Sequence, residues 1–290
     1  MPYNLIELRK QRDSINEAIE FDWKHLQRGF DNKIVNSFQY PSLNLVSELR
    51  SQAILNYLIE GNTFDFFNSC YHSACVYCNF NNFSVMGLPS HKDCYQLGES
   101  NGFFSSILTF RKNNFKKVIQ ALPPIENSNL YIQRASGYFI DALSALLLGY
   151  EDIVSRRITD LKMLHDKFTI DTSKEVTLCE SLATKNLVAT QENISKYLDR
   201  YAKYTKYTAS FGIAEELISI NGLALIRIAN ILGIDVKIAH PLAPMELQNT
   251  TPDQREFVNK YLVGIVDYPA MQNNKEYWDG WKLSLIHISE

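Results

Sequence analysis

The stretch that decides the fold is Glu215–Leu247, which reads EELISINGLALIRIANILGIDVKIAHPLAPMEL. From Leu217 to Leu232 most positions are apolar, and no broad polar stripe interrupts them. A helix that is apolar nearly all round is one that other elements cover on every side. Gly233 follows directly, at the position where a glycine commonly ends a helix. The sequence therefore predicts a central, buried helix over about residues 217–232.

The residues after this helix predict an extended segment. Ile234–Ile238 alternates apolar and polar residues, which is the period of an extended chain with one buried side. Pro241 and Pro244 bias the residues before them toward extended conformations.

Most of the remaining chain has apolar residues at helical spacing. Residues 81–102 are rich in Asn, Ser and Gly, and we expect them to be irregular. Thr172-Ser173-Lys174-Glu175 has the pattern of a capping box, in which the first and last side chains bond to the helix start. The other expected helices cover residues 3–27, 43–59, 64–80, 103–110, 115–122, 138–148, 153–164, 173–190 and 194–207, and one begins near residue 251.

The expected helices divide into two halves. Pro123-Pro124 and the polar run 126–129 indicate a joint, so we expect an N-terminal helical half over 1–122 and a C-terminal one over 130–282. Strand signals are nearly absent. The predicted fold is all-α, an array of antiparallel helix pairs around the buried helix, and it is open whether the array is solenoid-like. Residues 283–290 (LSLIHISE) resemble translated sequencing-adapter DNA, and we interpret them as a non-native tail.

Composition excludes several classes of protein. The net charge of −3 argues against non-specific binding to nucleic acid. The apolar helix contains Arg227 and is shorter than the ~20 residues needed to cross a bilayer, so we expect no membrane partner. The first residues, MPYNLIELRKQRDSINEAIE, have no apolar core of a signal peptide. Five cysteines are an odd number, which is typical of reduced thiols, and we expect a cytoplasmic protein.

One cluster of residues has the composition of a zinc site. Cys75-x2-Cys78 is followed by His91-x2-Cys94, and thiolates with an imidazole suit tetrahedral zinc. However, Cys75 and Cys78 lie on an expected helix among large apolar residues, where cysteine is a common small core residue. We favour core thiols, and we expect no metal and no cofactor.

Residues for catalysis are not evident in the sequence. There is no glycine-rich phosphate loop, no G-x-S-x-G and no H-E-x-x-H. His165-Asp166 is a lone pair at a helix end, where a histidine often complements the helix dipole. We therefore assign no catalytic residue and expect a protein that is not an enzyme, with its oligomeric state left open.

The segment Tyr277–Trp281 (YWDGW) has little apolar periodicity. Trp278 and Trp281 either dock back onto the helices, which we favour, or anchor a partner protein.

The segment Asn221–Leu247 resembles the end of the immunity protein 49 family of bacterial polymorphic toxin systems. The likeness consists of the helix GLALIRIANILGI, a short Val-containing extended piece, and then Pro-Leu-Ala-Pro-x-Glu-Leu. Ala142–Gly149 and the paired helices up to Tyr207 are also similar, and the first half agrees only through the helix end at Ala53–Asn62. The likeness covers about half of the chain, and its motifs concern packing.

The resemblance implies an α-helical cytoplasmic protein that binds and blocks a cognate toxin, and it supplies no catalytic residues. If the toxin is a nuclease, its cleft is basic, and Glu215, Glu216 and Asp267 are acids that could face it. Two alternatives stay open. One is a helical-repeat scaffold for protein interactions, and the other is a zinc-dependent enzyme that uses the cluster from Cys75 to Cys94.

Overall fold

The computed structural model describes residues 4–31, 39–85, 95–109, 131–168, 170–205 and 213–250. Ten α-helices and one 3-10 helix form in these ranges, and none of them contains a strand, so the all-α prediction is confirmed. The helices are α1 (Leu5–Asp31), α2 (Gln39–Glu60), α3 (Thr63–Val85), α4 (Tyr95–Thr109), α6 (Tyr131–Leu148), α7 (Glu151–Phe168), α8 (Ser173–Ala183), α9 (Leu187–Thr205), η5 (Ile213–Glu216), α10 (Ile220–Ile231) and α11 (Met245–Asn249).

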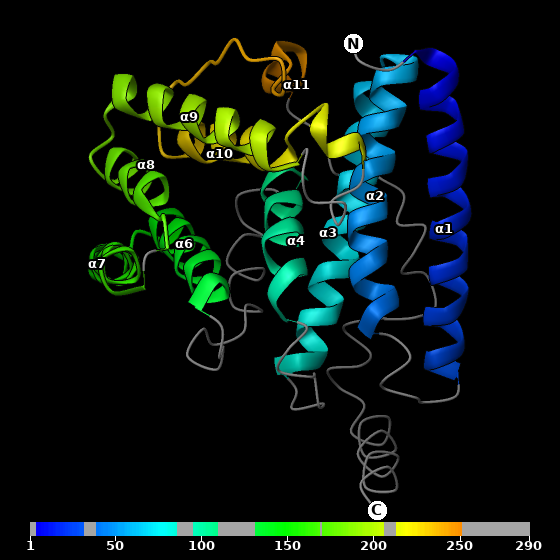
Figure 1. The fold of residues 1–290 in the computed structure, drawn as a ribbon, viewed down its shortest axis with the longest axis horizontal. Coiled ribbons are helices and arrows are strands. Elements are labelled where there is room, and N and C mark those ends of the chain that lie inside the picture. Colours follow the sequence, from blue (N-terminus) through cyan, green and yellow to red (C-terminus); the bar gives the residue numbers. More distant parts are fainter. Residues whose placement is uncertain are drawn as a thin grey trace, which may run out of the picture.

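Helices that follow one another along the chain pack against one another, as the predicted array requires. This holds for α1 to α4 in turn and for α6 to α9 in turn. In Figure 1, α1, α2, α3 and α4 lie side by side, and α9 and α10 run across the end of α4. Contacts among α4, α6, α9 and α10 join the first series of helices, α1 to α4, to the second series, α6 to α9.

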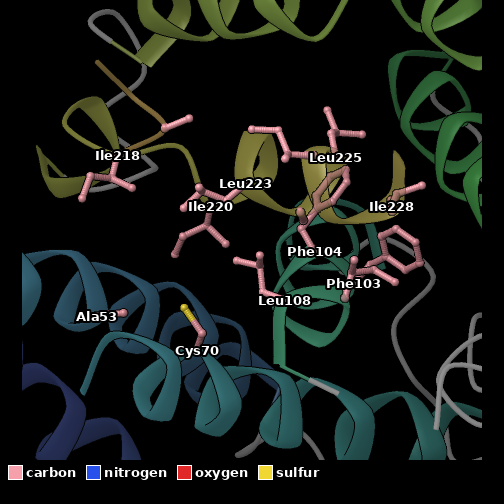
Figure 2. Packing of buried hydrophobic residues seen from close by; sticks show 14 of the residues in the cluster. Ala53, Cys70, Phe103, Phe104, Leu108, Ile218, Ile220, Leu223, Leu225 and Ile228 are labelled. Carbon is pink, nitrogen blue, oxygen red and sulfur yellow. The ribbon is translucent and has the colours of Figure 1, made fainter. Parts of the chain in front are cut away.

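The central helix of the array is α10, which packs against α4, α6, α9 and α11. Nine of its residues are buried, including Ile220, Leu225 and Ile228, which Figure 2 shows in one cluster with Phe103 and Phe104 of α4. Its start is fixed by Ser219, whose hydroxyl oxygen accepts a hydrogen bond from the Gly222 amide at 3.0 Å. The prediction of a central buried helix is confirmed, although its first residue is Ile220 and not Leu217.

The end of α10 and the segment after it follow the sequence pattern. Gly233 has a φ of +86°, the left-handed conformation expected of a glycine that ends a helix. Ile234, Val236 and Ile238 are buried while the residues between them are exposed. The segment therefore has one buried side, as the alternation of apolar and polar residues predicts. No neighbouring strand pairs with this segment among the described residues. Instead the side chain of Gln248 bonds to the Ile238 amide at 3.0 Å and to its carbonyl at 2.6 Å.

Two expectations about element boundaries are wrong. Helix α4 begins at Tyr95, inside the stretch that was expected to be irregular. The helix from Ser173 ends at Ala183 rather than Thr190, because Asn186 caps a new helix by accepting a bond from the Ala189 amide at 3.1 Å.

The predicted capping box at Thr172 is also wrong in its contacts. Helix α8 begins at Ser173 as expected, but Thr172 makes no side-chain cap. Its hydroxyl donates to the Leu161 carbonyl at 2.7 Å instead, which ties the start of α8 to α7. The expected helices at 115–122 and after residue 251, and the joint at 123–129, lie outside the described residues.

Buried apolar residues from both sides of that joint belong to one continuous cluster, which extends from Leu8 on α1 to Leu247 on α11. Among the helices that the structure describes, none combines the length and the apolar character that crossing a membrane requires.

Candidate functional site

The most unusual chemical feature of the described chain is an ion pair in the middle of the hydrophobic cluster. Arg50 of α2 donates from Nε to Oε1 of Glu215 in η5 at 2.7 Å, although the two residues are 165 positions apart. Their side chains are 0% and 1% exposed, so neither charge reaches water. Burying two charges is costly unless each is fully hydrogen-bonded, which makes their other contacts decisive.

Those other contacts come from three further helices. Nη2 of Arg50 donates to the amide oxygen of Asn221 on α10 at 2.8 Å, and Nη1 donates to Ser105 Oγ on α4 at 3.4 Å. The second carboxylate oxygen of Glu215 accepts a hydrogen bond from the Tyr201 hydroxyl on α9. We call Arg50, Glu215, Asn221, Ser105 and Tyr201 the central network. It links α2, α4, α9, η5 and α10, the elements that meet where the two series of helices join.

The electrostatics of the central network favour a permanently charged arginine. Burial opposes the charge of Arg50, but the neighbouring Glu215 outweighs it, so the pKa of Arg50 is raised above its ordinary value. Burial first, and Glu215 second, raise the pKa of Tyr201 well above its usual range. Burial also raises the pKa of the adjacent Cys70 thiol to about 12. Since a thiol reacts as its thiolate, Cys70 is a poor nucleophile here.

Of the four members that were not singled out from the sequence, which are Arg50, Asn221, Ser105 and Tyr201, two carried a signal. Arg50 falls on the apolar stripe of its helix, one turn after Val46 and next to Leu49, where a lone charge needs a buried partner. Asn221 interrupts the otherwise apolar central helix in the same way. Tyr201 carried no such signal, because the sequence contains 16 tyrosines and most serve the core.

The acids expected to face a partner have different positions. The expectation for Glu215 is wrong: its carboxylate is enclosed by Arg50 and Tyr201, and a side chain that is 1% exposed cannot contact a second protein. Glu216, the next residue, is half-buried. Asp267, Trp278 and Trp281 lie outside the described residues.

Some of the cysteines are described by the structure and others are not. Cys75 is buried, as are Cys70 on the same helix and Cys179 on α8. Cys78 lies on α3, but the structure does not describe its side chain, and His91 and Cys94 are outside the described ranges. Within the described ranges, no three His, Cys, Asp or Glu side chains gather in a way that could hold a metal ion. Because the structure describes the side chain of only one of the four predicted zinc ligands, Cys75, the zinc hypothesis is neither confirmed nor contradicted.

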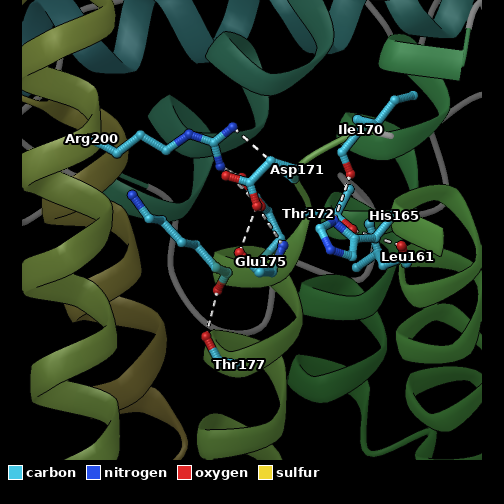
Figure 3. A network of polar contacts seen from close by, with 10 residues as sticks. Leu161, His165, Ile170, Asp171, Thr172, Glu175, Thr177 and Arg200 are labelled. Atoms are coloured by element: carbon cyan, nitrogen blue, oxygen red, sulfur yellow. Dashed lines mark hydrogen bonds and ion pairs between the residues drawn. The ribbon is translucent and has the colours of Figure 1, made fainter. Parts of the chain in front are cut away.

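A second polar network ties α7, α8 and α9 at the other end of the array (Figure 3). Arg200 of α9 donates to both carboxylate oxygens of Glu175 on α8, at 3.2 and 3.3 Å, and to the Asp171 carbonyl at 3.2 Å. His165, from the pair noted in the sequence, has its Nδ1 3.2 Å from the Ile170 carbonyl and serves the same loop. The contacts of both networks hold helices in place.

A third cluster fixes α6 to α7. Nε of Arg157 donates to Asp141 at 2.5 Å and Nη1 donates to Asp160 at 3.0 Å, while its guanidinium lies 5.1 Å from the ring centre of Tyr138. The described part of the molecule is thus cross-braced at its centre and along its second series of helices. When the chain is compared with protein-family models, with curated proteins and with solved structures, none of the three comparisons finds a match.

Proposed function

We propose that this chain is an immunity protein, which acts in the cytoplasm by binding a cognate bacterial toxin one to one and blocking it. The observation that carries the proposal is the position of the segment that resembles the immunity protein 49 family. Asn221–Leu247 includes most of the buried helix α10 and the whole of the segment that packs beside it. The resemblance thus lies in the part of the sequence that organises the fold.

The polar networks support a binding role rather than a reacting one. The charges of Arg50 and Glu215 are enclosed and hydrogen-bonded to each other. Their effect is to hold five elements in one arrangement. A surface carried on a pre-ordered scaffold loses less entropy on binding, and this favours tight, stoichiometric association.

Of the residues that we propose to contact the partner, Glu216 is the one whose side chain the structure describes. Glu216 is half-buried at the end of η5 and directly follows the buried Glu215 in the sequence. Asp267, Trp278 and Trp281 remain proposed partner residues from the sequence.

Co-expression with the product of the adjacent reading frame tests this function. We expect growth to be restored at equimolar expression and the two chains to co-purify as a stable complex. Glu216→Gln should weaken the complex, whereas Asp13→Asn, which changes an exposed acid on α1, should leave it unchanged. A protective effect without any complex would instead favour an enzyme, and a complex without protection would favour an interaction scaffold.

A further inference from the structure

Helix α1 carries a carboxyl group on its buried side. Asp22 is 7% exposed and lies in line with Ile19 and Leu26, which are also buried. The spacing of three and four residues places all of these side chains on one face of the helix. In Figure 1, α1 is the outermost helix of its series, and the helix it packs against is α2.

Glu48 lies on the opposing face of α2. The register between the helices is set by Gln52, whose Nε2 donates to Asn16 Oδ1 of α1 at 2.7 Å. Glu48 is one turn before Gln52 and so points the same way. Its Oε2 is buried and has no hydrogen-bond partner among the described residues. A proton on Glu48 gives this side chain a donor, which can bond to the Asp22 carboxylate.

Two carboxyl groups in contact inside an interface do not both ionise easily, because each charge opposes the other. Burial is the largest effect and the charge of Asp22 the second, and together they raise the pKa of Glu48 to about 8. Around neutral pH the pair therefore holds one shared proton, and the hydrogen bond joins α1 to α2.

Two charged side chains near this pair have other partners among the described residues. Arg50 is two positions from Glu48, on the far side of the helix, where it meets Glu215 of η5 and Ser105 of α4. On α1, Lys24 pairs with Glu20 at 2.6 Å. On α3, the bond from Ser73 Oγ to the Val46 carbonyl sets a register that brings the buried His72 to the level of Glu48. His72 is thus the titratable group on α3 that a test must separate from Glu48.

We propose that Asp22 and Glu48 form a pH-sensitive clasp, which holds α1 against α2 while the pair retains its proton and loosens α1 when the proton is lost. The proposal is independent of the proposed toxin binding. The folded-state pKa of Glu48 is raised, so its contribution to stability is fully present below the ordinary range of a carboxyl group. That contribution is lost as the pH rises through about 8.

Trp23 provides a probe on the same helix, because it is half-buried and packs against the core. In a full-length chain with Trp278→Phe and Trp281→Phe, it is the tryptophan that remains of the three. We expect its emission to shift to longer wavelength, and its quenching by acrylamide to increase, as the pH is raised from 6.5 to 9.5. Acrylamide distinguishes exposure of the ring from a direct effect of the nearby charge.

Glu48→Gln should abolish this transition, since the amide keeps a donor for Asp22 and does not titrate. Glu60→Gln, an exposed acid on the same helix, is the matched control and should retain the transition. His72→Gln should retain it as well. The proposal fails if the parent chain shows no transition in this range, if Glu48→Gln keeps it, or if His72→Gln abolishes it. Even if a variant does not fold, the absence of a transition in the parent chain overturns the proposal.

Discussion

Arg50 and Glu215 form the buried ion pair at the junction of the two helix series. A buried ion pair is not by itself evidence of stability, because desolvation can cost as much as the attraction returns. What distinguishes this pair is that Asn221, Ser105 and Tyr201 supply the remaining hydrogen bonds. Removing one partner leaves the other charge buried and uncompensated, and it leaves its hydrogen-bonding neighbours without a partner too.

The first prediction follows from this arrangement. Arg50→Met should lower the free energy of unfolding by about 3–5 kcal/mol, the cost typical of leaving one buried charge unpaired. The double variant Arg50→Met with Glu215→Leu should lose less than the sum of the two single changes, because neither charge remains. Arg12→Met, which breaks the partly exposed pair with Glu60, is the control and should cost less than about 1 kcal/mol. Urea denaturation measures all four, and strict additivity of the two buried changes would contradict the account.

A second prediction at this scale concerns the thiols. Cys75 is a buried residue of α3, as the preferred interpretation of the sequence expects. We therefore expect protein purified without chelator to contain no stoichiometric zinc when its metal content is measured. One zinc per chain that disappears on Cys78→Ser would restore the zinc hypothesis.

The sequence could not predict which residue pairs with Arg50, and the reason is physical. The pattern of Val46, Leu49 and Ala53 identifies the buried face of α2, and hence that Arg50 has to be paired. It does not identify Glu215, since the partner lies on an element far along the chain whose position depends on the whole fold. Glu215 itself stands beside Glu216 in the sequence, and only packing decides which of the two is enclosed.

At the scale of elements, two glycines permit close contact between helices. A Cβ on Gly102 of α4 would lie 1.9 Å from Cγ and 2.4 Å from Cβ of Tyr77, the rigid base of a buried side chain on α3. A Cβ on Gly222 of α10 would lie 2.2 Å from Cδ2 of Leu198, which is the movable end of its side chain.

The third prediction compares these two positions. Gly102→Ala should destabilise the protein by about 1–3 kcal/mol, because the tyrosine or the helix has to move. Gly222→Ala should cost clearly less, since Leu198 can change rotamer, and both changes gain about 1 kcal/mol of helix propensity. Thermal unfolding of the two variants measures the difference. Equal losses, or a larger loss at Gly222, would show that the contact between α3 and α4 is not as close as described.

The segments that form helices could be predicted from the sequence, because apolar spacing and terminal glycines are local signals. Gly233 has positive φ at the end of the helix it was expected to terminate, and Gly149, which directly follows the expected helix 138–148, has positive φ as well. The break between α8 and α9 was predicted too late in the sequence, after residue 190, because Asn186 and Lys185 look like ordinary helix-surface residues, and the cap forms only once the chain turns. The start of α4 was missed because composition rich in Asn, Ser and Gly outweighed its weak periodicity.

At the scale of the whole molecule, the described helices form one all-α array that is cross-braced by buried polar contacts. The function that we propose is that one chain neutralises one toxin molecule. It is tested most directly by titrating the purified product of the adjacent reading frame with this chain and measuring the residual toxic activity. The account predicts a linear fall that reaches zero at one chain per toxin molecule. Complete loss of activity at a small fraction of equimolar chain would mean turnover, and it would contradict neutralisation by stoichiometric binding.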